Sequence, residues 1–255
     1  MMVRLTQLKK TWDETEGYCS NLSLGGFDDW RVPSKDELST LVDYSKSNPT
    51  IDSSFVNIKS YYYWSSTTYA NFTDRAWNVD FSNGNTYYYG KTLGLSVRCV
   101  RGGQFGTFDT LSSLKKVGFS RDATKEIVHD SKSGLMWQDN VEVKTVTKTW
   151  DESQGYCSNL TLGGFDDWSV PSIHELKTLT DFSKFNPAIN EIFVNITSNR
   201  YWSSTTYAND TDAAWVVYFY SGHTNNNYKT YSHYVRCVRG GQSDSFVNLL
   251  FKKVK

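Results

Sequence analysis

The pattern of polar and apolar positions predicts two short helices followed by several strands. Thr11 to Glu14 and Ser34 to Glu37 are capping boxes, in which a hydroxyl and a carboxylate satisfy free backbone N–H groups at a helix start. Apolar residues between Leu38 and Val42 supply a buried stripe after the second box. Beyond Pro49 the helical spacing ends, and aromatic and β-branched segments broken by Asn, Ser and Gly indicate strands. The predicted fold class is therefore α+β.

The same series of elements occurs twice. The segment from Thr11 to Gln104 recurs from Thr149 to Gln242 without insertion or deletion, and roughly two thirds of the aligned positions are identical. Each copy has the size of a domain and is longer than a solenoid unit of roughly 20 to 50 residues. The predicted organisation is a first module at 1–104, a connection at 105–117, a second module at 118–242 and a C-terminal extension at 243–255.

The second module is predicted to open with a β-hairpin that has no counterpart in the first. Alternating segments at 126–129 and 134–137 flank the turn-like sequence from Asp130 to Ser133. In the corresponding place the first module has only Met1 to Lys10. Either the N-terminal hairpin of the first module is missing or altered, or the chain is cut from a longer array.

The amino-acid composition argues against two classes of function, nucleic-acid binding and membrane insertion. The 255 residues carry 27 Lys and Arg against 27 Asp and Glu, so a nucleic-acid partner that needs a basic surface is not expected. No apolar run approaches the roughly 20 residues of a membrane helix, and the mean hydropathy is -0.53. We therefore expect a soluble protein without membrane insertion. Met1 to Leu5 lacks the apolar core of a signal peptide.

Four cysteines occupy matching places, two in each module, and no C-x-x-C pair that would suggest zinc occurs. One interpretation pairs Cys19 with Cys99 and Cys157 with Cys237. Each bond would close a loop of roughly 80 residues and stabilise its module by about 4 to 5 kcal/mol in the chain-entropy model. The alternative is a set of buried free thiols in a cytosolic protein.

The sequence from Gly25 to Trp30, repeated from Gly163 to Trp168, could at first sight be a metal or phosphate loop. It lacks the spacing and the lysine of a phosphate-binding loop. We expect instead that Gly25 ends a helix, Asp28 caps a turn and Trp30 enters the core. A Ca²⁺ site is the alternative, and no other cofactor is expected. The 4 His residues are not matched between the copies, which argues against a shared metal or acid–base role.

Differences between the copies concentrate from Phe72 to Ser96, where more than half of the positions differ. The fixed positions Trp77, Val79 and Phe81 alternate as the core side of a strand does. The exchanged positions hold Tyr, Asn, Ser, His, Asp and Gly, which are the residue types of binding surfaces, since Tyr gives rigid contact area and Asn and Ser adaptable hydrogen bonds. Drift on an exposed loop is the alternative, but drift should also admit Lys, Glu and Gln.

We therefore predict a ligand-binding face at the exchanged positions of each module. In the first module these are Asn78, Asp80, Ser82, Asn85, Tyr87, Tyr88 and Tyr89. In the second they are Val216, Tyr218, Tyr220, His223, Asn225, Asn226, Asn227, Tyr228, Tyr231, His233 and Tyr234. Because the two sets differ, the modules would bind different ligands. The tryptophans recur between the copies and are expected in the core.

Four ordered motifs, present in both copies, resemble the C-terminal domain family of the Legionella collagen-like protein. They are Thr-Trp-Asp-Glu…Tyr-Cys, Gly-Gly-Phe-Asp-Asp-Trp-x-Val-Pro-Ser-x-x-Glu-Leu, Tyr-Trp-Ser-Ser-Thr-Thr and Val-Arg-Cys-Val-Arg-Gly. The resemblance implies a C-type-lectin-like fold of the formylglycine-generating-enzyme type, with Cys19 and Cys157 on the first helix opposite Cys99 and Cys237 on the closing strand. It also implies bacterial surface adhesion and binding of sulfated polysaccharides, often as trimers. Hypervariable receptor-binding proteins of diversity-generating retroelements have a similar fold, and the exchanged residues resemble their asparagine-codon diversification.

The sequence thus predicts a non-enzymatic recognition protein, secreted or at the cell surface, whose partner is a glycan or a host or cell-surface protein. A homo-oligomer is compatible with this interpretation. The Glu-Pro-Asn and Trp-Asn-Asp triplets of calcium-dependent lectins do not occur, and neither does the two-cysteine active site of the formylglycine-generating enzyme. An enzyme of that type, with a reactive Cys99 or Cys237, and a structural spacer are the alternatives.

Overall fold

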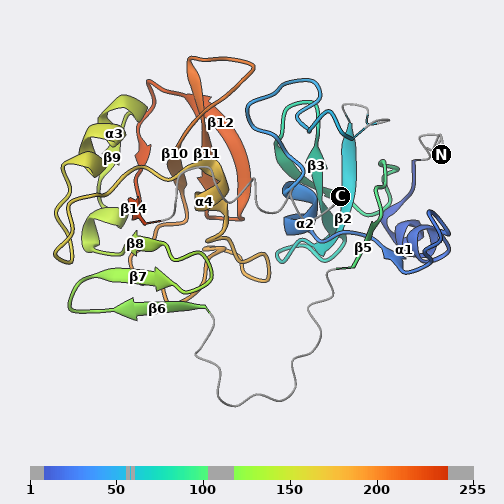
Figure 1. The fold of residues 1–255 in the computed structure, drawn as a ribbon, viewed down its shortest axis with the longest axis horizontal. Coiled ribbons are helices and arrows are strands. Elements are labelled where there is room, and N and C mark those ends of the chain that lie inside the picture. Colours follow the sequence, from blue (N-terminus) through green and yellow to red (C-terminus); the bar gives the residue numbers. More distant parts are fainter. Residues whose placement is uncertain (1–8, 56–57, 59–60, 103–117, 241–255) are drawn as a thin grey trace, which may run out of the picture.

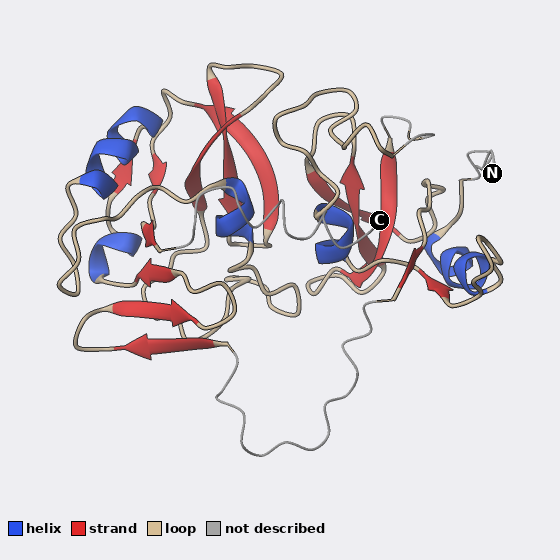
Figure 2. Cartoon of the chain, in the orientation of Figure 1, coloured by secondary structure: helices blue, strands red, loops and turns tan. Residues whose placement is uncertain are grey.

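The computed structural model describes residues 9–55, 58, 61–102 and 118–240, which fold into two modules of the same kind (Figure 1). The predicted connection at 105–117 and extension at 243–255 lie outside the described residues. The helices are few and short, and antiparallel sheets predominate (Figure 2). The α+β prediction is confirmed.

The first module contains a three-stranded antiparallel sheet in the order β2-β3-β4 and a separate pair of strands, β1 and β5. Its elements are α1 (Trp12–Ser20), β1 (Trp30–Arg31), α2 (Lys35–Ser39), β2 (Tyr62–Thr68), β3 (Arg75–Asp80), β4 (Thr86–Gly90) and β5 (Val100–Arg101). Helix α2 contacts β2 and β3, so it covers one face of the three-stranded sheet.

The second module repeats this plan and adds strands at its beginning. Its elements are β6 (Phe119–Asp122), β7 (Ile127–Asp130), β8 (Met136–Gln138), the 3-10 helix η1 (Val141–Lys144), β9 (Thr147–Lys148), α3 (Trp150–Ser158), α4 (Ile173–Lys177), β10 (Arg200–Thr206), β11 (Ala213–Tyr218), β12 (His223–Tyr228), β13 (His233–Tyr234) and β14 (Val238–Arg239). Two sheets result, ordered β12-β11-β10-β13-β9 and β14-β8-β7-β6.

The hairpin predicted at the start of the second module is confirmed. Strands β7 and β8 are antiparallel, with Ile127 opposite Gln138 and Val128 opposite Trp137. Strand β6, which the sequence pattern did not single out, pairs with β7 on its other edge. Strand β8 also pairs with β14, so the hairpin joins the beginning of the module to its end.

Each of the four described α-helices begins at a capping box, as predicted. At the first, a carboxylate oxygen of Glu14 accepts a hydrogen bond of 2.8 Å from the backbone N–H of Thr11. That bond lowers the pKa of Glu14 and keeps the carboxylate charged where the helix dipole favours a negative group. Helix starts were predictable because the residues that make a cap lie within one turn of each other.

The predicted disulfides are present. Cys19 bonds Cys99 and Cys157 bonds Cys237, each with a Cα–Cα distance of 5.6 Å. In each module the bond ties the first helix to the segment just before the last strand. No cysteine remains free, so the alternative of buried thiols is excluded.

The two modules pack against each other through equivalent residues. The ring of Tyr44 meets Trp215 edge-on at 4.8 Å between centroids, and its repeat counterpart Phe182 meets Trp77 at 5.3 Å. Strands β4 and β12 also approach each other, where the N–H of Thr224 donates to the hydroxyl of its counterpart in β4 at 3.0 Å. Buried side chains from both modules join in one continuous cluster, and a second cluster lies within the second module.

The recurring tryptophans divide into two groups. Trp64, Trp77, Trp168, Trp202 and Trp215 are buried in the core. Trp12, Trp30 and Trp150 are half-buried, and their indole N–H groups donate to backbone carbonyls. The core prediction is thus correct for the first group and too strong for the second.

The role expected for Gly25 is wrong. Helix α1 ends at Ser20, well before this residue. Gly25 and Gly26 have φ of 65° and 81° and form the two-residue turn between Leu24 and Phe27, which pair with each other. Two consecutive positive φ values require glycine at low strain, and this accounts for the repeated Gly-Gly pair. Over the described residues, no helix is long and apolar enough to cross a membrane.

Candidate tyrosine-rich binding face

The structure gathers part of the predicted set on one face of the β2-β3-β4 sheet. Tyr62 lies opposite Asp80 across β2 and β3, and Asn78 lies opposite Tyr87 across β3 and β4. Directly paired residues share a face, and side chains alternate between faces along a strand. We call Tyr62, Asp80, Tyr87 and Tyr89 the tyrosine face.

Three phenol rings form the centre of this face. Tyr62 contacts Tyr87 edge-on at 5.7 Å and Tyr89 edge-on at 5.3 Å between centroids. Tyr87 and Tyr89, two residues apart on β4, are parallel at 6.1 Å. Hydrogen bonding to Tyr89 and burial raise the pKa of Tyr62 to about 12. The rings are half-buried, so each is held in place and still presents a surface.

The polar residues beside the rings shape the turn between β3 and β4. One carboxylate oxygen of Asp80 accepts from the N–H and the hydroxyl of Ser82, at 2.8 and 2.6 Å. The amide of Asn85 donates to the Tyr87 hydroxyl at 3.1 Å. Asp80 and Asn85 are buried, at 4% and 5% exposure. They position the tyrosines and have little surface of their own for a ligand.

Asn78 and its counterpart Val216 lie below the surface, and both are fully buried. Val216 packs in a cluster with Trp202 and Ala214. Neither amide atom of Asn78 has a hydrogen-bond partner in the described part of the chain. Although both residues belong to the predicted set, they are buried beneath their neighbours on that face and offer no surface to a ligand.

The equivalent face of the second module has different chemistry. The guanidinium of Arg200 lies 4.8 Å from the centre of the Tyr218 ring, and Tyr218 in turn stacks on Tyr220 at 5.6 Å. His223 contacts Tyr218 edge-on, and its Nδ1 is 2.7 Å from the Ser221 hydroxyl. Burial, aided by Arg200, lowers the pKa of His223 to about 4, so the imidazole is neutral at pH 7. The charge on this face therefore comes from Arg200.

Tyr62 and Arg200 were missed by sequence reasoning. They are repeat counterparts that differ, but they lie before the Phe72 to Ser96 window in which differences concentrate. The exchange itself was a visible signal. Only the pairing of β2 with β3 shows that they adjoin the exchanged positions.

The rest of the predicted set lies elsewhere. Tyr88 is on the opposite face, stacked on Tyr69 at 3.9 Å, and Tyr69 in turn contacts Phe185 of the second module. Asn225 and Asn227 replace two tyrosines of the face on β12, and Asn226 replaces Tyr88. Tyr228, the last residue of β12, and Tyr231 are about half exposed and pack edge-on against each other at 5.9 Å. His233 lies against Trp202, and Tyr234 stacks on Tyr201.

The Gly-Gly-Phe-Asp-Asp-Trp loops hold ion pairs. Asp29 accepts from Arg101 at 2.8 Å, and the guanidinium of Arg101 covers the ring of Phe27 at 3.5 Å. Hydrogen bonding from Arg101 lowers the pKa of Asp29. The second module repeats the arrangement with Asp167 and Arg239. Within the described ranges, no group of three or more His, Cys, Asp or Glu is placed to hold a metal.

Both modules match a known family of domains. The model of the Lcl C-terminal domain matches the chain twice, over residues 3–101 and 126–239. These ranges agree with the two modules of the fold. No curated protein matches the chain.

Proposed function

Because the chain belongs to the Lcl C-terminal domain family in both of its modules, we propose that it is a non-enzymatic recognition protein that binds a carbohydrate through the tyrosine face. The observation that carries this proposal is the cluster of Tyr62, Tyr87 and Tyr89, three half-buried rings in mutual contact. Tyrosine rings offer an apolar surface to the C–H face of a sugar and hydroxyls to its polar edge. Rings already held by their neighbours lose little conformational entropy on binding.

The second module takes a different ligand in this proposal. Its counterpart face replaces Tyr62 with Arg200 and two further tyrosines with Asn225 and Asn227. Arg200 belongs to no ion pair within the described residues, and a guanidinium binds carboxylate or sulfate well. An acidic sugar therefore fits this face better than a neutral one.

The cysteines support recognition over catalysis. All four are in disulfides, so none offers the thiolate that a formylglycine-generating type of enzyme needs. Two disulfides also suggest an oxidising environment. We place the protein outside the cell or on its surface.

An array of glycans and proteins tests the proposal, probed with the full chain, with a variant of each face and with a control variant. Tyr87→Ser with Tyr89→Ser should abolish binding to the ligands of the first module and leave those of the second. Arg200→Gln should weaken the binding of acidic ligands to the second module about tenfold or more. Tyr231→Ser, which removes an exposed ring outside both faces, is the matched control. If both face variants still bind the same sugars, the proposal is contradicted. If the chain binds proteins on the array and no glycan, the ligand is a protein and not a carbohydrate.

A further inference from the structure

The two modules contact each other with the reciprocity of a two-fold axis. Tyr44 packs on Trp215, and their repeat counterparts pack on each other in the same way. At the axis a residue meets its own counterpart, as Thr86 meets Thr224, with 3.3 Å between the two hydroxyl oxygens. In a contact of this kind each position occurs once on either side of the axis, so the two sides can be compared directly.

On one side of the axis, aromatic rings continue from the second module onto the first. Tyr218 stacks on Tyr220 at 5.6 Å, and Tyr220 contacts Phe185 edge-on at 4.4 Å between centroids. Phe185 meets Tyr69 of the first module at 5.9 Å, and Tyr69 lies beside Phe72 at 6.2 Å. Tyr69 is buried, and the other four rings keep part of their surface exposed. We call these five residues the aromatic track.

An arginine lies at each end of the aromatic track. The guanidinium of Arg200 is 4.8 Å from the centre of the Tyr218 ring, and that of Arg75 is 5.0 Å from the centre of the Phe72 ring. Neither arginine belongs to an ion pair in the part of the chain that the structure describes, although Asp74 directly precedes Arg75. A guanidinium with free donors binds carboxylate or sulfate well. Both ends of the track can therefore receive an acidic group.

The other side of the axis has short or polar residues at the equivalent positions. Phe185, Tyr220, Phe72 and Arg75 are replaced there by Ser47, Ser82, Asp210 and Ala213. The modules still meet on that side, where Tyr44 contacts Trp215 and His174. Packing of the modules thus does not require the exchanged rings or the arginine. Asp210 would also repel an acidic ligand, so only one side suits such a ligand.

We propose that the aromatic track extends the binding face of the second module onto the first, and that the chain binds one extended acidic glycan along it. This inference rests on the proposed function, in which the face of the second module takes an acidic sugar at Arg200. Sugar rings pack on the exposed aromatic rings, and acidic groups towards the two ends of the bound segment pair with Arg200 and Arg75. The charge of the ligand follows from the two arginines, and its length from the continuity of the rings between them.

The affinity of such a ligand depends on its length. A glycan that reaches both arginines gains a second anchor at high effective concentration, whereas a short one reaches Arg200 alone. Affinity should therefore rise with the length of the glycan, and the rise should depend on Arg75.

Oligogalacturonates of increasing length are the probe, because every sugar in them carries a carboxylate and no particular register is needed. Their binding to the full chain is measured by isothermal titration calorimetry, with neutral cello-oligosaccharides of the same lengths for comparison. We expect long oligogalacturonates to bind about tenfold or more tightly than the disaccharide. Arg75→Gln should abolish this gain and leave the affinity for the disaccharide unchanged. Arg200→Gln should weaken the binding of both.

Two further variants separate the track from a general effect of charge and from misfolding. Lys132→Gln removes one positive charge from an exposed turn of the second module and should change neither affinity. Phe185→Ser copies Ser47 on the other side of the axis and should reduce the gain with length. An unchanged affinity of Phe185→Ser for the disaccharide shows that the second module is folded.

Equal affinity of the unchanged chain for short and long oligogalacturonates overturns the proposal, as does a gain with length that survives both Arg75→Gln and Phe185→Ser. In either case the proposed function stands if Arg200→Gln weakens the binding of the disaccharide. A gain that is lost in Lys132→Gln shows unspecific attraction of charge and also overturns the proposal. If Arg200→Gln binds every length as the unchanged chain does, the proposed function of the second module fails, and the extended site with it.

Discussion

At the scale of single residues, the exchange of Tyr62 for Arg200 decides the character of the two faces. The tyrosine places a third ring beside Tyr87 and Tyr89, while the arginine sets a positive charge beside Tyr218. The surrounding backbone is the same, since β2 pairs with β3 as β10 pairs with β11. One scaffold therefore presents two chemistries through a few side chains.

Substitutions at Asn78 and Val216 test how burial limits which residues can replace each other between the modules. Asn78→Val copies Val216 and removes two buried amide atoms that have no described partner. We expect the free energy of unfolding to rise by about 1 kcal/mol. The reverse change, Val216→Asn, should lower it by about 2 kcal/mol, because it strands an amide in an apolar cluster. Urea denaturation measures both, and destabilisation by Asn78→Val would show that the amide is satisfied in solution.

At the scale of elements, local signals were sufficient for the helices. Each cap is made by residues three apart, so the sequence contains the whole interaction. Strand β6 was missed because Phe119–Asp122 has little alternation, and its place is set by pairing with β7. The loop after α1 was misread because glycine serves equally for a helix end and for a two-residue turn.

The turn between β11 and β12 is predicted to need glycine for two reasons. Gly222 has φ of 84°, and a Cβ there would lie 2.8 Å from Cε1 of Phe182. Gly222→Ala should therefore lower the free energy of unfolding by about 2 kcal/mol or more, through both strain and overlap.

Gly26 is the matched control for that turn. It has φ of 81° with nothing within 4 Å of an added Cβ. Gly26→Ala should therefore lower the free energy of unfolding by the backbone strain alone, about 1 kcal/mol. Thermal denaturation compares the two variants. If Gly222→Ala and Gly26→Ala lose the same stability, the Phe182 ring moves aside without a cost in free energy.

At the scale of the whole molecule, the two modules share a hydrophobic core and are not structurally separate domains. The contact includes Lys35, which is 1% exposed and lies 3.8 Å above the ring of Phe182. Its counterpart in the second module is Ile173. Burial lowers the pKa of Lys35 to about 7, and burial also lowers the pKa of Lys177, on the same interface, to about 8.

These lysines predict how stability depends on pH. Between about pH 7 and pH 10 the unfolded chain holds the proton of Lys35 and the folded chain releases it, so the free energy of unfolding rises with pH. Below pH 7 both states are protonated and this dependence ends. Urea denaturation at pH 7 and pH 9 should show the rise, and Lys35→Ile should reduce it and stabilise the chain at pH 7. Lys125→Ala, at an exposed lysine, is the control, and an unchanged slope in Lys35→Ile would contradict the prediction.

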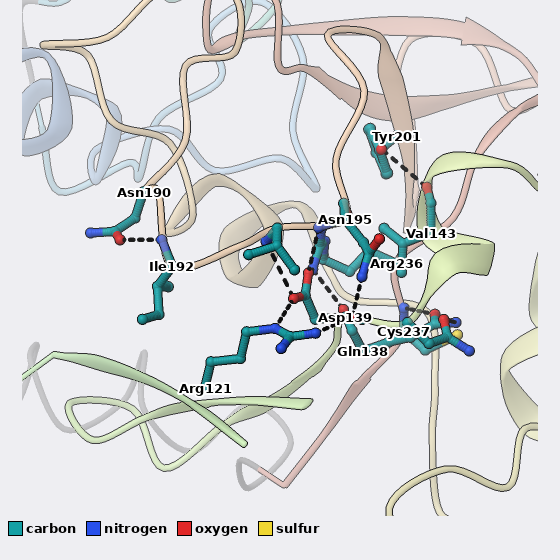
Figure 3. A network of polar contacts seen from close by, with 12 residues as sticks. Arg121, Gln138, Asp139, Val143, Asn190, Ile192, Asn195, Tyr201, Arg236 and Cys237 are labelled. Atoms are coloured by element: carbon teal, nitrogen blue, oxygen red, sulfur yellow. Dashed lines mark hydrogen bonds and ion pairs between the residues drawn. The ribbon is translucent and has the colours of Figure 1, made fainter. Parts of the chain in front are cut away.

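The amino-acid sequence was sufficient to find the duplication, the family and the helix starts, and it offered the cysteine pairs that the structure then confirmed. These depend on contacts between near neighbours or on comparison of one copy with the other. Which exchanged residues reach the surface became visible only in the folded chain, since Asn78 and Tyr87 share a face but differ in burial. The folded structure also shows that the modules share a core, and that the buried guanidinium of Arg236 pairs with the carboxylate of Asp139, about a hundred residues earlier in the chain (Figure 3). Burial and charge pairing depend on chain segments far apart in sequence, and no local pattern contains them.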